Sequence, residues 1–229
     1  MKNWILASVA LAGGLVGAGA MYVAKPGGDG VRDYLLAHPE VIPEAMAKLQ
    51  ERESSKSVTA LRSGIETPFG DAAIGSMNPD VTLVEYYDYN CGYCRASLPA
   101  IRHLAASDPK LRIVFRELPI LAPSSRDAAR MSLLAAAQGK FSAFHDALYA
   151  NGRVSADTIA AAARTAGVDV SKLPEMQPRL DAEIARNMDV AGRLGMTGTP
   201  SWVVGNRVLA GALPIEDLRK AIAAAREQS

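Results

Sequence analysis

The chain has 229 residues, of which 49% are hydrophobic and 21% are charged, with a formal net charge of +1. This length can bury one sizeable core and carry an additional element. The sequence shows no basic stripe and no interleaving of aromatic and basic residues, so it gives no reason to expect a nucleic-acid partner.

The N-terminal segment has the pattern of an export signal. Lys2 precedes an uncharged stretch from Trp4 to Ala24, and the small residues at 18–20 suit a cleavage site. The stretch, at about 20 residues, is also long enough to stay in a bilayer as an anchor. We therefore expect residues 1–24 to be a signal peptide or a signal anchor. Either alternative places the rest of the chain in the periplasm, free or tethered to the inner membrane.

The segment at residues 31–64 is expected to be helical and follows a glycine-rich joint at residues 26–30. Two prolines, Pro39 and Pro43, predict one helix to about Ala37 and a second from about Pro43. With few large apolar residues, the segment cannot form a core alone. It either packs on the main domain or associates with its own copies, and we favour a homo-oligomer formed through residues 31–64.

The next part of the chain predicts a strand–helix–strand unit. Residues 81–88 are rich in β-branched and aromatic residues, which indicates a strand. Directly afterwards, Cys91-Gly92-Tyr93-Cys94 opens a helix with an apolar periodicity that extends through Leu104. A second strand follows at residues 111–117, so the order is that of a βαβ unit.

The C-terminal half is expected to hold a helical insert and then a hairpin and a helix. Helices are predicted near residues 124–138, 141–149, 155–166 and 178–194, with no convincing strand among them. Residues 200–211 predict a hairpin with its turn at Gly205-Asn206, and residues 214–226 a closing helix. The fold class is therefore α/β, with one domain at residues 67–229 that contains a helical insert at about residues 124–194.

The two cysteines of the chain predict redox chemistry. Only two residues separate Cys91 from Cys94, so a disulfide between them would close a tiny loop and stabilise the fold little. The thiolate is the nucleophile in disulfide exchange, and a helix N-terminus favours an anion at Cys91. Cys94 lies one turn deeper on the same face, where it can resolve a mixed disulfide. We expect no cofactor beyond a redox-active Cys91–Cys94 disulfide.

Metal binding is the main alternative for the same cysteines. A zinc site needs two further ligands, but His38, His103 and His145 are scattered without ligand spacing. We therefore predict no metal site. A non-catalytic module that holds Cu(I) between the thiolates of Cys91 and Cys94 stays open, because two thiolates alone can bind this soft ion.

Two features distant from the cysteines favour the redox interpretation. Glu85 lies six residues before Cys91 in an apolar strand, where it can accept the proton that Cys94 loses, unless it simply faces solvent. Thr199-Pro200 precedes the hairpin, and a proline is tolerated at the first residue of a strand. A cis Thr199–Pro200 bond beside the cysteines would expose backbone for substrate, although composition alone favours trans.

These motifs together resemble the DsbA-type branch of the thioredoxin superfamily over roughly residues 79–225. The resemblance rests on residues 85–94, the helical insert and the segment at residues 198–200. It implies a thioredoxin fold with an inserted helical domain, preceded here by an N-terminal helical extension. It also implies that Cys91 attacks, Cys94 resolves, Glu85 is a buried carboxylate, Pro200 is cis, and Thr199 and Pro200 bind substrate.

Within this branch, residues 34–42 are similar to the start of ScsC/Com1-like proteins, which are associated with bacterial copper tolerance. The dipeptide Gly92-Tyr93 lacks the proline and histidine of the best-known oxidase pattern, so extreme oxidising strength is not implied. The expected activity is oxidation or isomerisation of disulfides in exported cysteine-containing proteins. A membrane or periplasmic redox partner would supply or remove electrons.

Overall fold

The structure, a computed structural model, describes residues 28–227. The expected export segment at residues 1–24 lies outside this range. The chain divides into two compact units that meet in sequence at Gln50 and Glu51.

The N-terminal unit contains helix α2 (Gly28–Ala37) and the start of helix α3 (Val41–Glu66). The break between them contains Pro39, one of the two prolines expected to interrupt the helix. Helix α2 begins at Gly28, inside the expected glycine-rich joint. The first turn of a helix has few intrahelical bonds to lose, so glycine is tolerated there. Several large apolar side chains of this unit are half-exposed or more: Val31, Tyr34, Leu36, Ile42, Met46 and Leu49.

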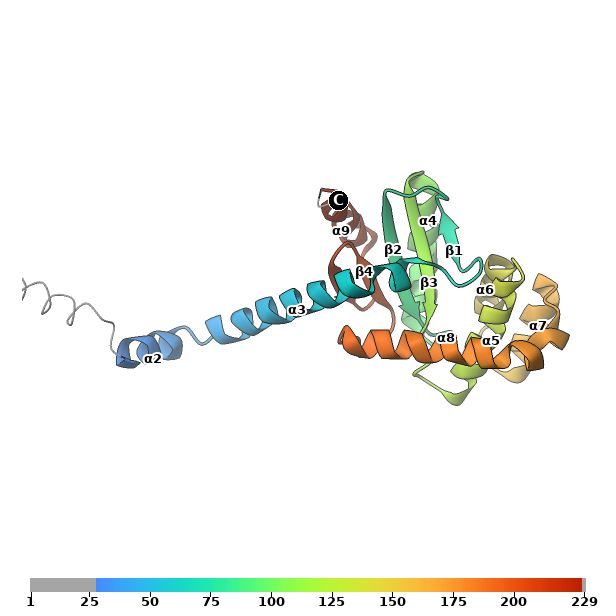
Figure 1. Cartoon of the computed structure of the whole chain (residues 1–229), viewed down its shortest axis with the longest axis horizontal. Helices are drawn as coiled ribbons and strands as arrows, with labels where there is room; N and C mark the ends of the chain where they lie inside the picture. The colour runs from blue at the N-terminus through green and yellow to red at the C-terminus, as the bar shows by residue number, and fades with distance from the viewer. Residues whose placement is uncertain (1–27, 228–229) are drawn as a thin grey trace, which may run out of the picture. The chain divides into compact units, whose positions relative to one another are not determined.

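The second unit is built on a five-stranded sheet with the order β1-β3-β2-β4-β5 (Figure 1). The central strands β2 (Val81–Tyr87) and β3 (Leu111–Glu117) are parallel, as their helical crossover α4 (Gly92–Ser107) requires. The predicted hairpin is present as β4 (Ser201–Val204) and β5 (Arg207–Ala210), and β4 pairs antiparallel to β2. The edge strand β1 (Ala73–Gly75), which is antiparallel to β3, was not expected.

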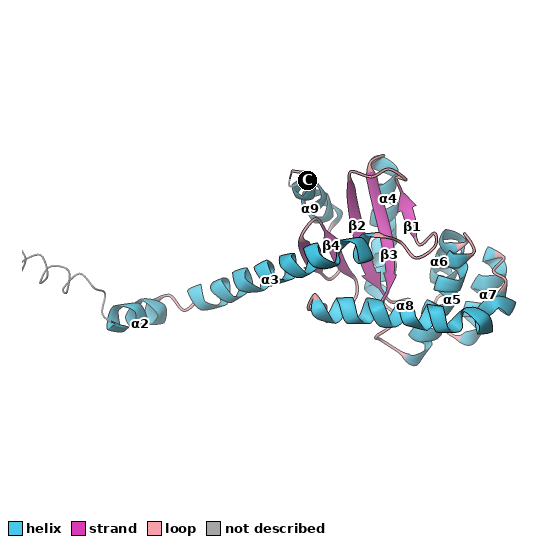
Figure 2. Cartoon of the chain, viewed as in Figure 1, coloured by secondary structure: helices cyan, strands magenta, loops and turns pink. Residues whose placement is uncertain are grey.

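Helices cover both faces of the sheet (Figure 2). Successive residues of β2 belong to opposite faces, as the two buried clusters show. Leu83 and Tyr87 pack with α4 and with the closing helix α9 (Ile215–Arg226). Val84 and Tyr86 pack on the other face, against the C-terminal half of α3 and the end of α8 (Leu173–Arg193). A central strand buried on both faces therefore leaves the Glu85 side chain inside the protein, on the same face as α4.

The helical insert lies between β3 and β4 in the chain, as predicted. It consists of α5 (Pro123–Ala137), α6 (Phe141–Ala150), α7 (Ala156–Ala166), the 3-10 turn η1 (Val170–Lys172) and α8. Helix α8 starts five residues before its expected position at Pro178. Pro178 lies inside the helix, where proline removes one backbone hydrogen bond, and packing of Leu173 and Met176 against the core offsets this cost.

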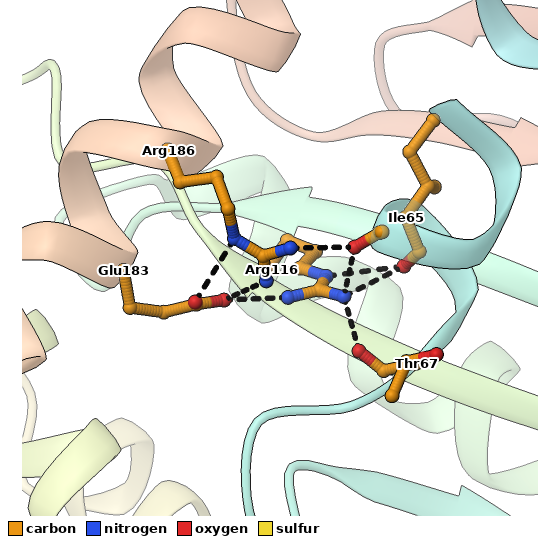
Figure 3. A network of polar contacts seen from close by, with 6 residues as sticks. Ile65, Thr67, Arg116, Glu183 and Arg186 are labelled. Atoms are coloured by element: carbon orange, nitrogen blue, oxygen red, sulfur yellow. Dashed lines mark hydrogen bonds and ion pairs between the residues drawn. The ribbon is translucent and has the colours of Figure 1, made fainter. Parts of the chain in front are cut away.

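A buried arginine joins the end of α3 to the sheet and to α8 (Figure 3). The Arg116 guanidinium, 1% exposed, lies 2.6 Å from Glu183 Oε1 and donates to the carbonyl oxygens of Gly64, Ile65 and Thr67. Those oxygens include helix-terminal acceptors without intrahelical partners. Arg186 also bonds Glu183 and Gly64 O. The C-terminal half of α3 is therefore an integral part of the second unit.

Candidate active site

Cys91 is the N-cap residue of α4. Its backbone is extended (φ −80°, ψ 113°), and its Sγ accepts a hydrogen bond from the backbone N–H of Cys94 at 3.4 Å. An N-cap side chain satisfies one of the donors that the first helical turn leaves unpaired. The sulfur thus lies where the free N–H groups and the helix dipole stabilise negative charge.

Both cysteines are free thiols and both are buried. Cys91 is 5% exposed and Cys94 is 1% exposed. The Cys91 thiol also donates a hydrogen bond to the carbonyl oxygen of Thr199 at 3.2 Å. Between the cysteines, Gly92 and Tyr93 are exposed, so the buried pair lies directly beneath a surface segment.

Glu85 lies in the interior rather than at the surface. Its side chain is 1% exposed, and its Oε1 has no hydrogen-bond partner among the described residues. Burial first, and then the negative charge of Cys91, raise the pKa of Glu85 well above its ordinary value. The solvent-facing interpretation of Glu85 is therefore excluded, and a carboxyl of high proton affinity lies near the cysteines.

Cys94 is held in its neutral form. Burial is the largest cause that raises the pKa of Cys94, and the nearby charge of Glu85 is the second. Asp88 opposes them through a backbone hydrogen bond to Cys94. A thiol in this setting needs an acceptor for its proton before it can act as a nucleophile.

The Thr199–Pro200 peptide bond is cis, as the resemblance implied. It directly precedes β4, and β4 pairs with β2, which leads to the cysteines. This pairing brings Thr199 to Cys91 from the far end of the chain. The structure therefore gathers all five residues that the sequence singled out, namely Cys91, Cys94, Glu85, Thr199 and Pro200.

Asp88 is a buried residue that sequence reasoning did not single out. Its side chain is 1% exposed, and its carboxylate accepts the backbone N–H groups of Asn90, Ile120 and Leu121. The available signal was an acidic residue at the end of a strand that is buried on both faces, three positions before Cys91.

A second unexpected group surrounds Glu117 at the end of β3. Tyr87 donates to Glu117, Tyr89 donates to Ser132 at 2.9 Å, and His145 Nδ1 lies 3.0 Å from the Tyr89 oxygen. Burial raises the pKa of Glu117 to about 8 and lowers that of His145 to about 3. These side chains come from β2, the loop that follows it, β3, α5 and α6, so only the tertiary fold brings them together.

No group of three or more His, Cys, Asp or Glu side chains is arranged to hold a metal ion within residues 28–227. His145 is buried among aromatic rings, including those of Tyr89 and Phe141, whereas His103 is exposed. In the same described range, none of the helices has both the length and the apolar character needed to cross a membrane.

Two known families match parts of this chain. Residues 82–223, more than half of the chain, match the DSBA-like thioredoxin domain family. The chain belongs to this family. Residues 28–55 also match the copper resistance protein ScsC N-terminal domain. The DSBA-like domain begins in β2 and ends in α9, so it contains both cysteines, Glu85 and the cis proline.

Solved structures support the same assignment. A thioredoxin-like oxidoreductase from Silicibacter pomeroyi DSS-3 is 39% identical, with a TM-score of 0.65, over 69% of this chain and 92% of that one. The thiol-disulfide exchange protein alpha-DsbA2 from Wolbachia pipientis is 25% identical, with a TM-score of 0.68, over 79% of this chain and 98% of that one. The fold is therefore a thioredoxin fold with an inserted helical domain.

Curated relatives are longer than this DSBA-like chain. The Na(+)/H(+) antiporter NhaA 1 of Salinispora arenicola is 32% identical over 163 residues, which are 69% of this chain and 25% of that protein. The chain thus spans about a quarter of the length of the curated relatives it matches.

Proposed function

We propose that this chain is an exported protein-disulfide oxidoreductase that works through Cys91 and Cys94. The observation that carries the proposal is the position of Cys91 at the N-cap of α4, with its sulfur in contact with the Cys94 N–H and the Thr199 carbonyl. Membership of the DSBA-like family supports the same chemistry.

The first step of exchange forms one S–S bond and breaks another. The Cys91 thiolate attacks a sulfur of the substrate disulfide, and the second substrate sulfur leaves as a thiolate that takes a proton. Cys94 then gives its proton to the Glu85 carboxylate and attacks the Cys91 sulfur. The substrate leaves reduced, and Cys91 and Cys94 are left as a disulfide.

Oxidation of a substrate is the same sequence in reverse. A substrate thiolate attacks Cys91 in the Cys91–Cys94 disulfide, and Cys94 leaves as a thiolate that takes the proton of Glu85. The raised pKa of Glu85 suits both roles, because it strengthens the carboxylate as an acceptor of the Cys94 proton and favours the protonated carboxyl that returns a proton to the Cys94 thiolate. The buried position of Cys94 supports its assignment as the resolving thiol.

Thr199 and Pro200 are proposed to bind substrate beside Cys91. The Thr199 carbonyl already accepts a hydrogen bond from the Cys91 thiol. A polypeptide that reaches Cys91 therefore meets this backbone at once and can pair with it.

The N-terminal region favours isomerisation over simple oxidation if it assembles the protein. Exposed Val31, Tyr34, Leu36, Ile42, Met46 and Leu49 supply apolar surface for contact with a second copy. An assembly through residues 31–64 would bring several cysteine pairs together on one substrate. Removal of residues 1–50 should then lower both the oligomeric state and the refolding of a scrambled multi-disulfide protein.

We infer the location and the physiological setting from two N-terminal segments, residues 1–24 and residues 28–55. The export pattern at residues 1–24 supports a periplasmic protein whose substrates are exported cysteine-containing proteins, served by a membrane or periplasmic redox partner. The match of residues 28–55 to the ScsC N-terminal domain supports a link to copper tolerance.

Exchange with a peptide disulfide tests the proposal. The wild-type chain should exchange it catalytically, and Cys91→Ser should abolish the reaction while leaving the fold unchanged by circular dichroism. Exchange that survives Cys91→Ser would contradict the proposal. Tight Cu(I) binding without any exchange would favour the alternative of a copper-holding module.

A further inference from the structure

Residues 88–91 connect β2 to α4, and Cys91 is the last of them. They form a tight turn, in which the Cys91 backbone N–H donates to the Asp88 carbonyl oxygen at 2.9 Å. The hydroxyl of Tyr149, which lies on α6, donates to the same oxygen at 3.3 Å. The position of Cys91 therefore depends on where the Asp88 main chain is held.

The Asp88 carboxylate fastens this turn to the loop between β3 and α5. Oδ1 accepts the backbone N–H of Asn90, within the turn, at 2.8 Å. Oδ2 accepts the N–H groups of Ile120 and Leu121, each at 2.9 Å. The Asp88 side chain is 1% exposed, and hydrogen bonds to an ionised acceptor are among the stronger ones in proteins. The turn and the β3–α5 loop are therefore held in a fixed relation.

The Cys91 sulfur depends on contacts that lie outside the turn. Its Sγ accepts the N–H of Cys94, in the first turn of α4, at 3.4 Å. The Cys91 thiol also donates to the carbonyl oxygen of Thr199, ahead of β4, at 3.2 Å. A shift of the turn would move the sulfur away from these partners. The N–H groups at the start of α4 would then stabilise its thiolate less.

We propose that Asp88 is the positioning residue of Cys91, and that the turn it fastens keeps the sulfur at the N-terminus of α4, where the thiolate forms and attacks. The carboxylate acts through the backbone, since its donors are the N–H groups of Asn90, Ile120 and Leu121. The proposal rests on the proposed function, because it concerns the same attack by Cys91.

Position and charge predict opposite results when Asp88 is replaced. A carboxylate disfavours a nearby thiolate through like charge, so loss of the charge alone would increase the thiolate fraction of Cys91. Loss of the fixed position would decrease that fraction, because the sulfur would leave the donors of the helix N-terminus. The direction of the change therefore distinguishes a positioning role from an electrostatic one.

The pH–rate profile of mixed-disulfide formation measures this direction. In the Cys94→Ser background Cys91 is the only thiol, and its adduct with a peptide disulfide is followed by intact mass. Asp88→Ala should lower the second-order rate constant near pH 6 by about threefold to tenfold and move the midpoint of the profile to higher pH. Asp88→Asn keeps one oxygen that can accept, so its rate constant should lie between those of the parent and Asp88→Ala.

The other titratable groups near the cysteines are the same in every variant. Glu85 on β2 interacts with the charge of Cys91, and Tyr149 on α6 interacts with those of Cys94 and Glu85. Both residues are retained throughout the series, and all variants carry Cys94→Ser. A difference between the profiles therefore reports the change at Asp88.

Asp71→Ala, also in the Cys94→Ser background, is the matched control. The Asp71 carboxylate likewise accepts a backbone N–H from a distant segment, that of Phe141 at the start of α6, at 3.2 Å. Its loss should lower the urea midpoint and leave the pH–rate profile unchanged. A purely structural Asp88 would behave in the same way, because molecules that stay folded would keep the position of the Cys91 sulfur.

The outcomes separate this inference from the proposed function. A Cys94→Ser parent that forms no adduct overturns the proposed function. A parent that reacts, with both Asp88 variants at its rate and midpoint, overturns the positioning role alone. A faster reaction with its midpoint at lower pH also overturns that role, because Asp88 would then act through its charge. Circular dichroism checks folding at each pH, and Asp88→Asn decides the result if Asp88→Ala does not fold.

Discussion

The Cys91 thiol donates a hydrogen bond to the Thr199 carbonyl oxygen at 3.2 Å, across 108 positions of sequence. The contact exists because β4 pairs with β2, so the segment that leads into β4 lies beside the segment that follows β2. The surroundings of the reactive sulfur are therefore set jointly by the two halves of the fold. Substitutions that act on this site should be separable from those that act only on stability.

Glu85→Gln should make the protein more stable and less active. Because the pKa of Glu85 is raised by burial and then by Cys91, the folded state binds more protons than the unfolded state above the ordinary glutamate pKa. The free energy of unfolding therefore falls as pH rises. Urea unfolding should show the variant more stable at pH 8 and equal to wild type near pH 4. Resolution of the mixed disulfide should slow about 10²-fold.

Glu117→Gln is the matched control for this trade-off. Burial raises the pKa of Glu117 to about 8, so its contribution to stability decreases as pH rises from about 4.5 towards 8. The variant keeps an acceptor for Tyr87 and should flatten the pH dependence of unfolding by a few kcal/mol. Exchange should stay within about twofold of wild type. A resolution defect as large as that of Glu85→Gln would assign a catalytic role to Glu117.

Arg116→Met should destabilise the second unit strongly. Arg116 and Glu183 form an ion pair at 2.6 Å, with side chains 1% and 9% exposed, and removal of one partner of a buried pair costs about 3–5 kcal/mol. The control is Arg102→Met, in which the pair with Asp146 has side chains 54% and 52% exposed. That loss should be at most about 1 kcal/mol. Equal urea midpoints for the two variants would argue against the role given to Arg116.

The buried residues of α3 predict how far the chain can be truncated from its N-terminus before the second unit loses stability. Val58 and Ile65 are each 1% exposed, and each buried side chain of this size stabilises by about 1.5–3 kcal/mol. A chain that begins at Glu51 should keep the stability of the second unit. A chain that begins at Thr67 should lose about 3–6 kcal/mol. Thermal unfolding of the two truncations compares them directly, and equal midpoints would contradict this assignment of α3.

Much of the fold could be predicted because its signals are local. The β-branched run of β2, the helix that opens at Cys91 and the Gly205-Asn206 turn each depend on neighbours in sequence. The strand β1 escaped prediction since its three residues form a strand only by pairing with β3. The early start of α8 was missed for a related reason, because packing of Leu173 and Met176 outweighs the cost of Pro178.

The residues of the site also fall into those that local sequence predicts and those that only the tertiary fold reveals. The cysteine spacing and the placement of Glu85 are visible in one stretch of sequence, whereas Thr199 and Pro200 were connected to them only through a resemblance. Asp88 and Glu117 could not be assigned, because Asp88 accepts from Ile120 and Glu117 accepts from Tyr87, partners that lie 32 and 30 positions away in the sequence. Amino-acid composition does not predict which donor forms a hydrogen bond with a given buried carboxyl group.

Trapping of the mixed disulfide tests the central claim most directly. Cys94→Ser should accumulate a covalent adduct with a peptide disulfide, because Cys91 can attack but no resolving thiol follows. Intact-mass and peptide mapping should place one peptide on Cys91. Cys91→Ser should form no adduct under the same conditions, since Cys94 is 1% exposed. An adduct on Cys94 in Cys91→Ser, or none on Cys91 in Cys94→Ser, would contradict the assignment of attacking and resolving thiols.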